Sequence, residues 1–448
     1  MGSKLRPGLV LLLMLLVALL IGCGDSEGEG EGEGGGDTGG AAATPIPDPK
    51  EPVELSFWSW APEIKEVVKL WNAEHPNIQV KVSQPAQGDA LVTKLTQANK
   101  AGNPPDLAQA EYQALPSMLG GDMVADITKF VAPIKGEFAD GTWQLVTFGE
   151  AIYGIPQDVA PMMLLYREDL FKRYGLTVPK TWDEFAAEAR KLREEDSKRY
   201  MTTFSAGDPG WFAGLSQQAG GQWWKVDGEN WTVGITDEGT KKVADYWNGL
   251  VTEKAILDQP MYTPQWNKQL NDGTLVAWPT AVWGPGVLEG IAPDTKGKWA
   301  MAPLPQWEAG GNAAGFWGGS STAVMKKSKH PAEAVKFASW MNTDPKAVEA
   351  LVSISGIYPA STKGQSTPAL QKPPAHMPND DGFFTRSAEI SKTAKGFTWG
   401  PNVNVTYQSY KDAFAKAIRS KTPFPGALDT MQKSTVEDMK KAGYKVSG

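Results

Sequence analysis

The sequence predicts an α/β fold divided into two lobes, and two observations lead to that prediction. About 400 of the 448 residues remain after an apolar leader and a polar segment, which is more than a single hydrophobic core usually holds. Along those residues, stretches with apolar side chains at every second position alternate with stretches of helical periodicity. That alternation is typical of α/β architecture.

The chain begins with a leader. Lys4 and Arg6 precede an unbroken apolar run over residues 9–21. As a helix this run would reach only ~20 Å, whereas a bilayer core is about 30 Å thick. A basic start, a short apolar run and a small residue before a cleavage point are typical of a secretory signal peptide. We therefore expect residues 1–22 to be removed.

A single cysteine follows the leader. The sequence Leu20-Ile21-Gly22-Cys23 resembles the lipobox of bacterial lipoproteins, so we expect Cys23 to carry a lipid. Cys23 is the only cysteine in the chain and cannot form an internal disulfide. The alternative is an inert, buried cysteine in an uncleaved anchor.

Residues 23–50 are predicted to form an acidic tether. Residues 24–44 contain only Gly, Glu, Asp, Ser, Ala and Thr, and such a segment cannot bury enough apolar surface to offset its ordering entropy. It carries −6 and the leader +2, so the chain from Pro45 onward carries −3 of the net −7. A nearly neutral folded part argues against a nucleic-acid partner, which requires a basic face. It is compatible with an uncharged ligand.

The first elements follow from apolar spacing. Alternation predicts strands over 53–57 and 78–82, and helical spacing predicts helices over 62–75 and 91–102. An apolar stripe over 243–250 predicts a later helix. Starting signals predict three more helices, at Thr181-x-x-Glu184, Pro331 and Ser409-x-x-Asp412. Trp223, Trp224 and Trp231 flank a predicted hairpin at Lys225-Val226-Asp227-Gly228.

Several segments occur in an order that resembles a known family. They are Ala101-Gly102-Asn103-Pro104-Pro105-Asp106-Leu107, Tyr153-Gly154-Ile155-Pro156 with Leu165–Phe171, Pro179–Phe185, Gly318-Gly319 with Lys329–Ala334, and Gly356–Pro359. The order is similar to that of extracellular solute-binding proteins of carbohydrate-uptake ABC transporters, the group that includes maltose-binding protein. Arg167 stands where the family usually has Asn. The likeness runs from about residue 50 to the C-terminus.

The resemblance implies a periplasmic-binding-protein-like fold of type II, in which crossing strands form a hinge and the ligand lies in the cleft between two lobes. The crossings would fall near residues 158–160, 313–316 and 358–361. Lobe 1 would comprise 51–158 plus 315–360, and lobe 2 would comprise 159–314 plus 361–448. The ligand-bound protein would dock on the permease subunits of a transporter.

Tryptophan is the most unusual feature of the composition, with eighteen residues. A flat, rigid indole can cover the apolar face of a sugar ring, while polar side chains pair with the hydroxyls. The tryptophans that fall in loops or at strand ends are candidate sugar contacts: Trp60, Trp211, Trp278, Trp283, Trp317 and Trp399. By resemblance, Trp283 lies where the family has a stacking aromatic. Other tryptophans fit the apolar faces or caps of helices and are expected in the core: Trp71, Trp182, Trp247 and Trp340.

Two carboxylates are the main polar candidates. Asp158 follows the Pro156 turn at the expected crossing and could accept hydrogen bonds from hydroxyls. Glu111 follows a strand over 107–110, and ligands of α/β sheets bind at the carboxyl ends of strands. Asp208 and Gln217 are secondary candidates.

The expected function is to bind an extracellular sugar, expected to be an oligosaccharide, in the cleft between the lobes and to deliver it to an ABC importer, without catalysis, cofactor or metal. The three histidines lie beside prolines or in a Pro-rich loop, and P-loop, zinc-protease and nucleophile-elbow motifs are absent from the sequence. Two alternatives remain: an exported glycosidase, since carboxylate pairs exist in any chain this long, and a receptor for a polyamine or ferric iron. We expect a monomer held by its lipid on the outer face of the cytoplasmic membrane, in a single-membrane cell.

Overall fold

The computed structural model describes residues 46–86 and 88–448. The predicted signal peptide, Cys23 and most of the predicted tether lie outside the described residues. Within those two ranges, no helix has both the length and the apolar character needed to span a bilayer.

The chain enters the fold through three strands. Strand β1 (Val53–Trp58) pairs in parallel with β2 (Ile78–Ser83) and with β3 (Leu107–Glu111). Helices α1 (Ile64–Glu74) and α2 (Gly88–Ala101) connect them. The four elements predicted for this part of the sequence are confirmed, because their alternating and helical apolar residues are the ones that become buried.

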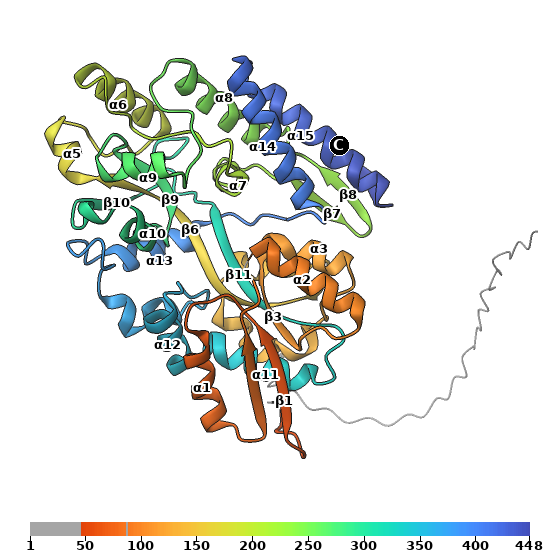
Figure 1. Cartoon of the computed structure of the whole chain (residues 1–448). Coiled ribbons are helices and arrows are strands. Elements are labelled where there is room, and N and C mark those ends of the chain that lie inside the picture. Colours follow the sequence, from red (N-terminus) through yellow and green to blue (C-terminus); the bar gives the residue numbers. More distant parts are fainter. Residues whose placement is uncertain (1–45, 87) are drawn as a thin grey trace, which may run out of the picture. The chain divides into compact units, whose positions relative to one another are not determined.

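Two long strands join the two halves of the fold. Strand β6 (Ile155–Arg167) pairs through its first part with β11 (Phe316–Val324), and β11 also pairs with β3. The second part of β6 pairs with β9 (Ala277–Ala281) and β10 (Trp299–Pro303). The sheet order is β10-β6-β11-β3-β1-β2, with β9 also on β6. A single strand thus belongs to both groups of elements (Figure 1).

The other elements form two groups on either side of this crossing (Figure 1). Around β1 to β3 lie α3 (Leu115–Gly120), α4 (Asp140–Gln144), β4 (Thr147–Phe148), β5 (Ala151–Ile152), α11 (Pro331–Thr343) and α12 (Pro345–Ser355). The other group holds α5 (Glu168–Arg173), α6 (Trp182–Glu195), α7 (Pro209–Gln218), β7 (Trp224–Asp227), β8 (Asn230–Val233), α8 (Glu238–Thr252), α9 (Pro264–Asn271), α10 (Gly284–Ile291), α13 (Phe383–Thr393), α14 (Val403–Ser420), α15 (Pro425–Lys441) and β12 (Lys445–Ser447).

Capping and turn residues place several helix and strand boundaries where the sequence predicted them. Thr181 caps α6 by accepting a 3.1 Å hydrogen bond from Glu184 N, and the Glu184 carboxylate reaches back to Lys180 N at 2.6 Å. Helix α11 begins at Pro331. The hairpin of β7 and β8 turns at Gly228, whose φ is +55°.

The predicted helix start at Ser409 is wrong, because α14 begins at Val403. Val403 and Thr406 are buried and extend the apolar stripe that continues through Tyr410. Asp412 accepts a 3.1 Å hydrogen bond from Gln408 Nε2 on the preceding turn and caps nothing. The Ser-x-x-Asp pattern therefore lies inside a helix.

Two glycines allow β11 to bend at the crossing. Gly318 and Gly319 have φ of +94° and +102°, and the register between β11 and β6 shifts between Phe316 and Gly319. A Cβ at Gly319 would lie 2.8 Å from Tyr112 Cε2 and 3.0 Å from Asp158 O. Positive φ and this close approach both require glycine at position 319.

Replacing Gly319 by alanine should destabilise the protein by about 1–3 kcal/mol, because the backbone conformation becomes strained and Tyr112 must move. Urea denaturation measures the change. Gly249→Ala is the matched control: nothing lies within 4 Å of its Cβ position on α8, and alanine should add about 0.5–1 kcal/mol there. If Gly319→Ala were as stable as the parent protein, the requirement for glycine at position 319 would be contradicted.

Candidate functional site

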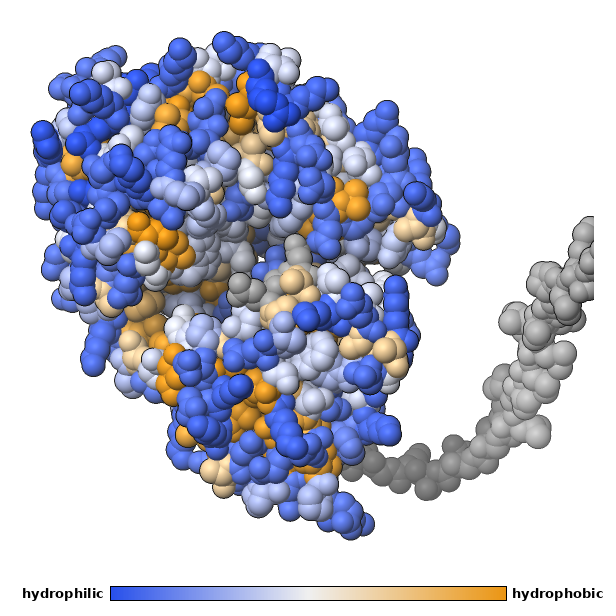
Figure 2. Space-filling view, viewed as in Figure 1, coloured by the Kyte–Doolittle hydropathy of each residue, from blue (hydrophilic) through white to orange (hydrophobic). Residues whose placement is uncertain are grey.

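A cavity of about 370 Å³ lies between the two groups of elements. Figure 2 shows the surface hollowed across the middle of the same view. The walls of the cavity come from six places: Trp60–Pro62 after β1, Gln109 on β3, Asp158 and Val159 on β6, Val282–Glu289 at the start of α10, Val352–Tyr358 at the end of α12, and a stretch from Leu370 to Phe384. Its lining residues, all in the described part of the chain, include two carboxylates and neither lysine nor arginine. The cavity therefore suits a neutral ligand better than an anion.

Trp60 presents a free aromatic surface in this cavity. Its backbone is fixed because Gln109 Oε1 accepts hydrogen bonds from Trp60 N at 3.1 Å and Ala61 N at 3.2 Å. The side chain is only partly buried. Within residues 46–86 and 88–448, its ring contacts no other aromatic ring and its indole N–H has no acceptor. Such a ring is available for stacking.

Asp158 lies at the point where the strands cross. Its carboxylate accepts a hydrogen bond from Ser320 Oγ, which in turn accepts one from Gln109 Nε2 at 2.9 Å. Its backbone oxygen accepts a 2.9 Å hydrogen bond from the Tyr112 hydroxyl. Burial raises the pKa of Asp158 to about 6, although the Ser320 hydrogen bonds oppose the shift. The carboxylate can accept further hydrogen bonds from hydroxyl groups.

A row of aromatic side chains leads away from the cavity. Trp283 lines the cavity, and its Nε1 donates a 3.0 Å hydrogen bond to Trp317 O. The Trp283 and Trp317 rings are 4.7 Å apart, and the Trp317 and Tyr262 rings are 6.4 Å apart. Tyr262 is 45% exposed and has φ of +62°. Sequence reasoning missed Tyr262; the only local signal is the loop between Pro260 and Pro264.

The structure brings Trp60, Asp158 and Trp283 to the cavity, but not every candidate. Trp211 is 1% exposed and donates its indole N–H to Pro279 O at 3.0 Å. Trp278 is equally buried and packs behind Trp283 and Trp317. Trp399 packs against Phe397 and other aromatics elsewhere. These three indoles support the core and do not line the cavity.

The remaining polar candidates are not among the residues that line the cavity. Glu111 ends β3, as predicted, opposite Ser320 in the register. Its carboxylate accepts a 2.9 Å hydrogen bond from Gln113 Nε2. Asp208 caps α7 through Trp211 N, and burial raises its pKa to about 6. Gln217 Oε1 accepts from Phe316 N at 2.8 Å and fixes the start of β11.

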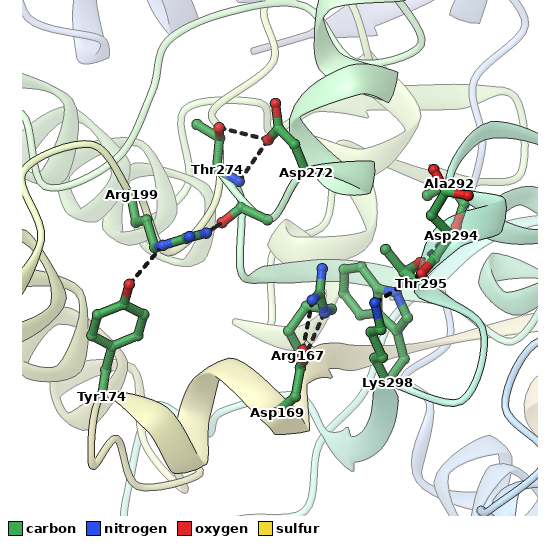
Figure 3. Close-up of polar contacts among 12 residues, drawn as sticks. Arg167, Asp169, Tyr174, Arg199, Asp272, Thr274, Ala292, Asp294, Thr295 and Lys298 are labelled. Atoms are coloured by element: carbon green, nitrogen blue, oxygen red, sulfur yellow. Dashed lines mark hydrogen bonds and ion pairs between the residues drawn. The ribbon is translucent and has the colours of Figure 1, made fainter.

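Arg167, which replaces the family's usual Asn, has a structural partner. Its Nε and Nη2 donate to the two oxygens of Asp169 at 2.8 and 2.7 Å (Figure 3). The guanidinium also lies 6.0 Å from the Trp299 ring. Arg167 therefore forms an ion pair at the C-terminal end of β6 and does not line the cavity.

Within the described ranges, no group of three or more His, Cys, Asp or Glu side chains is placed to hold a metal ion. The one histidine of the cavity wall, His376, is buried, and its Nε2 lies 3.1 Å from Thr295 Oγ1. Burial lowers the pKa of His376, which favours the neutral ring near pH 7.

Two α/β lobes that share crossing strands and enclose a polar, aromatic cavity define the architecture of a solute-binding protein. The chain belongs to the bacterial extracellular solute-binding protein family, whose profile matches residues 58–348. It is therefore an exported binding protein with a two-lobed fold.

Several known proteins are similar to this chain over most of its length. The arabinooligosaccharide-binding protein of Bacillus subtilis is 24% identical over 87% of this chain and 90% of its own. The galacto-N-biose-/lacto-N-biose I-binding protein of Bifidobacterium longum, solved with lacto-N-biose, is 29% identical over 89% of this chain and 100% of its own, with a TM-score of 0.78. A binding protein of B. animalis subsp. lactis, solved with β-1,6-galactobiose, is 26% identical with the same coverage and a TM-score of 0.73.

The raised pKa of Asp158 predicts a pH dependence of stability. A carboxyl whose pKa rises from 3.8 to about 6 on folding stabilises the fold while protonated, and this contribution is lost as the pH rises through 6. Asp158→Asn should therefore reduce the fall in the free energy of unfolding between pH 4.5 and pH 7.5. Urea denaturation across this range measures the slope, and Asp208 should leave a residual slope of the same sign.

Asp126→Asn is the control for that experiment. Hydrogen bonds from Thr128 lower the pKa of Asp126, so its contribution is complete above pH 4 and lost only in stronger acid. This variant should lose the same amount of stability at every pH tested. An unchanged slope in Asp158→Asn would contradict the burial of an ionisable carboxyl at the crossing.

Proposed function

We propose that this protein binds a neutral oligosaccharide in the cavity and delivers it to the permease subunits of an ABC importer. The observation that carries the proposal is the pairing of an unstacked indole, Trp60, with a half-buried acceptor, Asp158, in one cavity. A sugar ring offers an apolar C–H face to the first and hydroxyl donors to the second. The similar proteins solved with lacto-N-biose and β-1,6-galactobiose support a sugar as the ligand.

Under this proposal the two lobes divide the contacts. Lobe 1 comprises 51–158 plus 315–360 and supplies Trp60, with Glu111 at the end of β3 as a further candidate. Lobe 2 comprises 159–314 plus 361–448 and supplies Trp283. Trp317 on β11 and Asp158 on β6 act at the crossing. A ligand that touches both lobes makes its full set of contacts only when they close, so it stabilises the closed state by its differential affinity.

The ligand is expected to leave chemically unchanged. The similar proteins are named as binding proteins, and a transport receptor must release the sugar it captured. Incubation of the purified protein with oligosaccharides, followed by chromatography, tests this. Appearance of shorter sugars would support the glycosidase alternative instead.

Loss of either stacking ring should weaken binding. Trp60→Ala and Trp283→Ala should each cost about 1–3 kcal/mol of binding free energy, because a desolvated aromatic contact is removed. Isothermal titration calorimetry with lacto-N-biose, β-1,6-galactobiose and arabinotriose measures the change. Trp231→Ala is the control. Trp231, on β8 of the hairpin, is also partly exposed, but its ring packs on Tyr444. Unchanged affinity in both cavity variants would contradict the proposal that the sugar binds between Trp60 and Trp283.

We also propose that Cys23 is lipidated and that residues 24–44 tether a monomeric receptor to the outer face of the cytoplasmic membrane. The lipobox-like sequence before Cys23 and the acidic, Gly-rich composition after it support this. The full chain expressed in a bacterium should incorporate labelled palmitate and sediment with membranes, whereas Cys23→Ser should do neither. Sugar binding by the Cys23→Ser protein is the control for folding. Membrane association that persists in Cys23→Ser would contradict the lipid anchor.

A further inference from the structure

One buried amide, that of Gln109, forms hydrogen bonds both toward Trp60 and toward Asp158. Gln109 lies on β3, is 3% exposed and lines the cavity with those two residues. Strand β3 lies between β1 and β11, and β11 pairs in turn with β6 (Figure 1). A side chain on β3 can therefore reach the loop after β1, which carries Trp60, and also β11, which lies beside Asp158.

The amide oxygen of Gln109 fixes the loop that carries Trp60. Gln109 Oε1 accepts hydrogen bonds from Trp60 N at 3.1 Å and from Ala61 N at 3.2 Å. It also accepts one from Ser59 Oγ at 2.7 Å. Three consecutive residues thus donate to one oxygen, which fixes the backbone from which the Trp60 ring projects.

These backbone donors also determine the direction of every later bond. A backbone N–H can only donate, so the amide oxygen must face Trp60 and Ala61, and the amide nitrogen must face Ser320. Gln109 Nε2 donates to Ser320 Oγ at 2.9 Å, and the Ser320 hydroxyl donates to the Asp158 carboxylate. The Ser320 hydroxyl accepts from the amide, so its own proton is directed at Asp158.

The chain of bonds keeps Asp158 suited to accept from a ligand. Burial raises the pKa of Asp158 to about 6, and the hydrogen bonds from Ser320 oppose this rise. The bond from Ser320 therefore favours the ionised carboxylate, which accepts hydrogen bonds and donates none. Sugar hydroxyls can donate to such a group.

We propose that Gln109 is a positioning residue for sugar binding, which places the Trp60 ring through its amide oxygen and the Asp158 carboxylate through its amide nitrogen and Ser320. This inference rests on the proposed function and deepens it. Gln109 acts on the sugar through the two side chains that it places, so its contribution to affinity should disappear when those side chains are removed.

Ser320→Ala tests the bonds toward Asp158, because the bonds to the Trp60 loop remain. The probe is whichever of lacto-N-biose, β-1,6-galactobiose and arabinotriose binds the parent protein, measured by isothermal titration calorimetry. Affinity should fall about 3- to 10-fold, the range expected for one lost hydrogen bond. When Asp158→Asn is already present, Ser320→Ala should cost less than about twofold more, because its effect passes through the carboxylate.

Gln109→Met keeps the length of the side chain and removes the bonds in both directions. Affinity should fall about 10- to 100-fold, since two losses of about 3- to 10-fold multiply. When Trp60→Ala is already present, the loss should shrink to that of Ser320→Ala. In protein labelled with 5-fluorotryptophan, the ¹⁹F resonance of Trp60, identified by its disappearance in Trp60→Phe, should shift or broaden in Gln109→Met.

The pH dependence of affinity provides a readout that a general loss of stability would not move. Ser320→Ala removes a hydrogen bond that lowers the pKa of Asp158, so affinity should begin to fall at a higher pH than in the parent. Ser321→Ala should leave that pH unchanged. The other titratable groups near Asp158 and on the cavity lining are the same in both variants: Tyr112, Glu289, Tyr358 and His376.

Two buried polar residues on the neighbouring strands are matched controls. Gln157 Oε1 accepts a 2.9 Å hydrogen bond from Thr322 Oγ1, and Ser321 Oγ donates to Ala110 O at 3.2 Å. Neither Gln157 nor Ser321 lines the cavity. Gln157→Met and Ser321→Ala should lower stability but keep affinity within about twofold, and Gln157→Met should leave the Trp60 resonance in place.

A second substitution at position 109 keeps the test decisive if Gln109→Met does not fold. Gln109→Glu is nearly isosteric and keeps an oxygen for Trp60 N and Ala61 N, but it places an acceptor opposite Ser320 where a donor stood. It should weaken binding at least as much as Ser320→Ala and leave the Trp60 resonance nearly unchanged.

The outcomes separate this inference from the proposed function. If the parent binds a sugar but the Gln109 and Ser320 variants bind it as well as the controls do, the inference is overturned alone. Losses that add in full to those of Trp60→Ala and Asp158→Asn would overturn it as well, because Gln109 would then act independently of both. Failure of every sugar to bind the parent would remove the proposed function and this inference with it.

Discussion

A buried hydrogen-bond chain from Gln109 through Ser320 to Asp158 determines the geometry of the crossing and of the cavity. Gln109 uses both ends of its amide: Oε1 accepts from Ser59, Trp60 and Ala61, while Nε2 donates to Ser320. The Ser320 hydroxyl in turn donates a hydrogen bond to the Asp158 carboxylate. Since buried polar groups are costly when unpaired and cooperative when all are satisfied, this chain fixes three strands relative to one another. The same bonds that stabilise the sheet thus place the stacking ring and the acceptor carboxylate.

The crossing combines this rigid chain with backbone freedom at one point. Gly318 and Gly319 occupy positive φ, which lets β11 leave β6 and rejoin it one position later. On the other side of β6, Val159 N donates to Tyr358 O at 3.2 Å. Three segments distant in sequence therefore meet within a few residues of Asp158. Because side-chain bonds and backbone pairing are concentrated there, a change of backbone at the crossing would also move the cavity residue Asp158.

The sequence predicted the elements better than it predicted the site, for a physical reason. Periodic burial is a local property, so β1, α1, α6 and the hairpin of β7 and β8 follow directly from apolar spacing and capping residues. Whether an indole faces a cavity depends on distant packing. Trp211 and Trp283 both lie near Gly and Pro, yet Asp208 caps α7 and turns Trp211 inward, whereas Trp283 precedes α10 at the cavity. Only the loop between Pro260 and Pro264 pointed to Tyr262, because its exposure results from a left-handed backbone and a tryptophan cluster beneath it.

Two side chains of the cavity, the Trp60 ring and the Asp158 carboxylate, can each make further contacts that the protein itself does not supply. Both favour the same kind of ligand. The ring of Trp60 lacks an aromatic partner within the described residues, so it gains from a flat apolar face. The Asp158 carboxylate is partly desolvated and has one side-chain donor, Ser320, so ionisation is favoured by each additional hydroxyl that donates to it. A cation would satisfy the carboxylate but not the walls, and an anion would oppose both Asp158 and Glu289. A polyhydroxylated ring with an apolar face satisfies the indole and the carboxylate together without bringing a charge into the cavity.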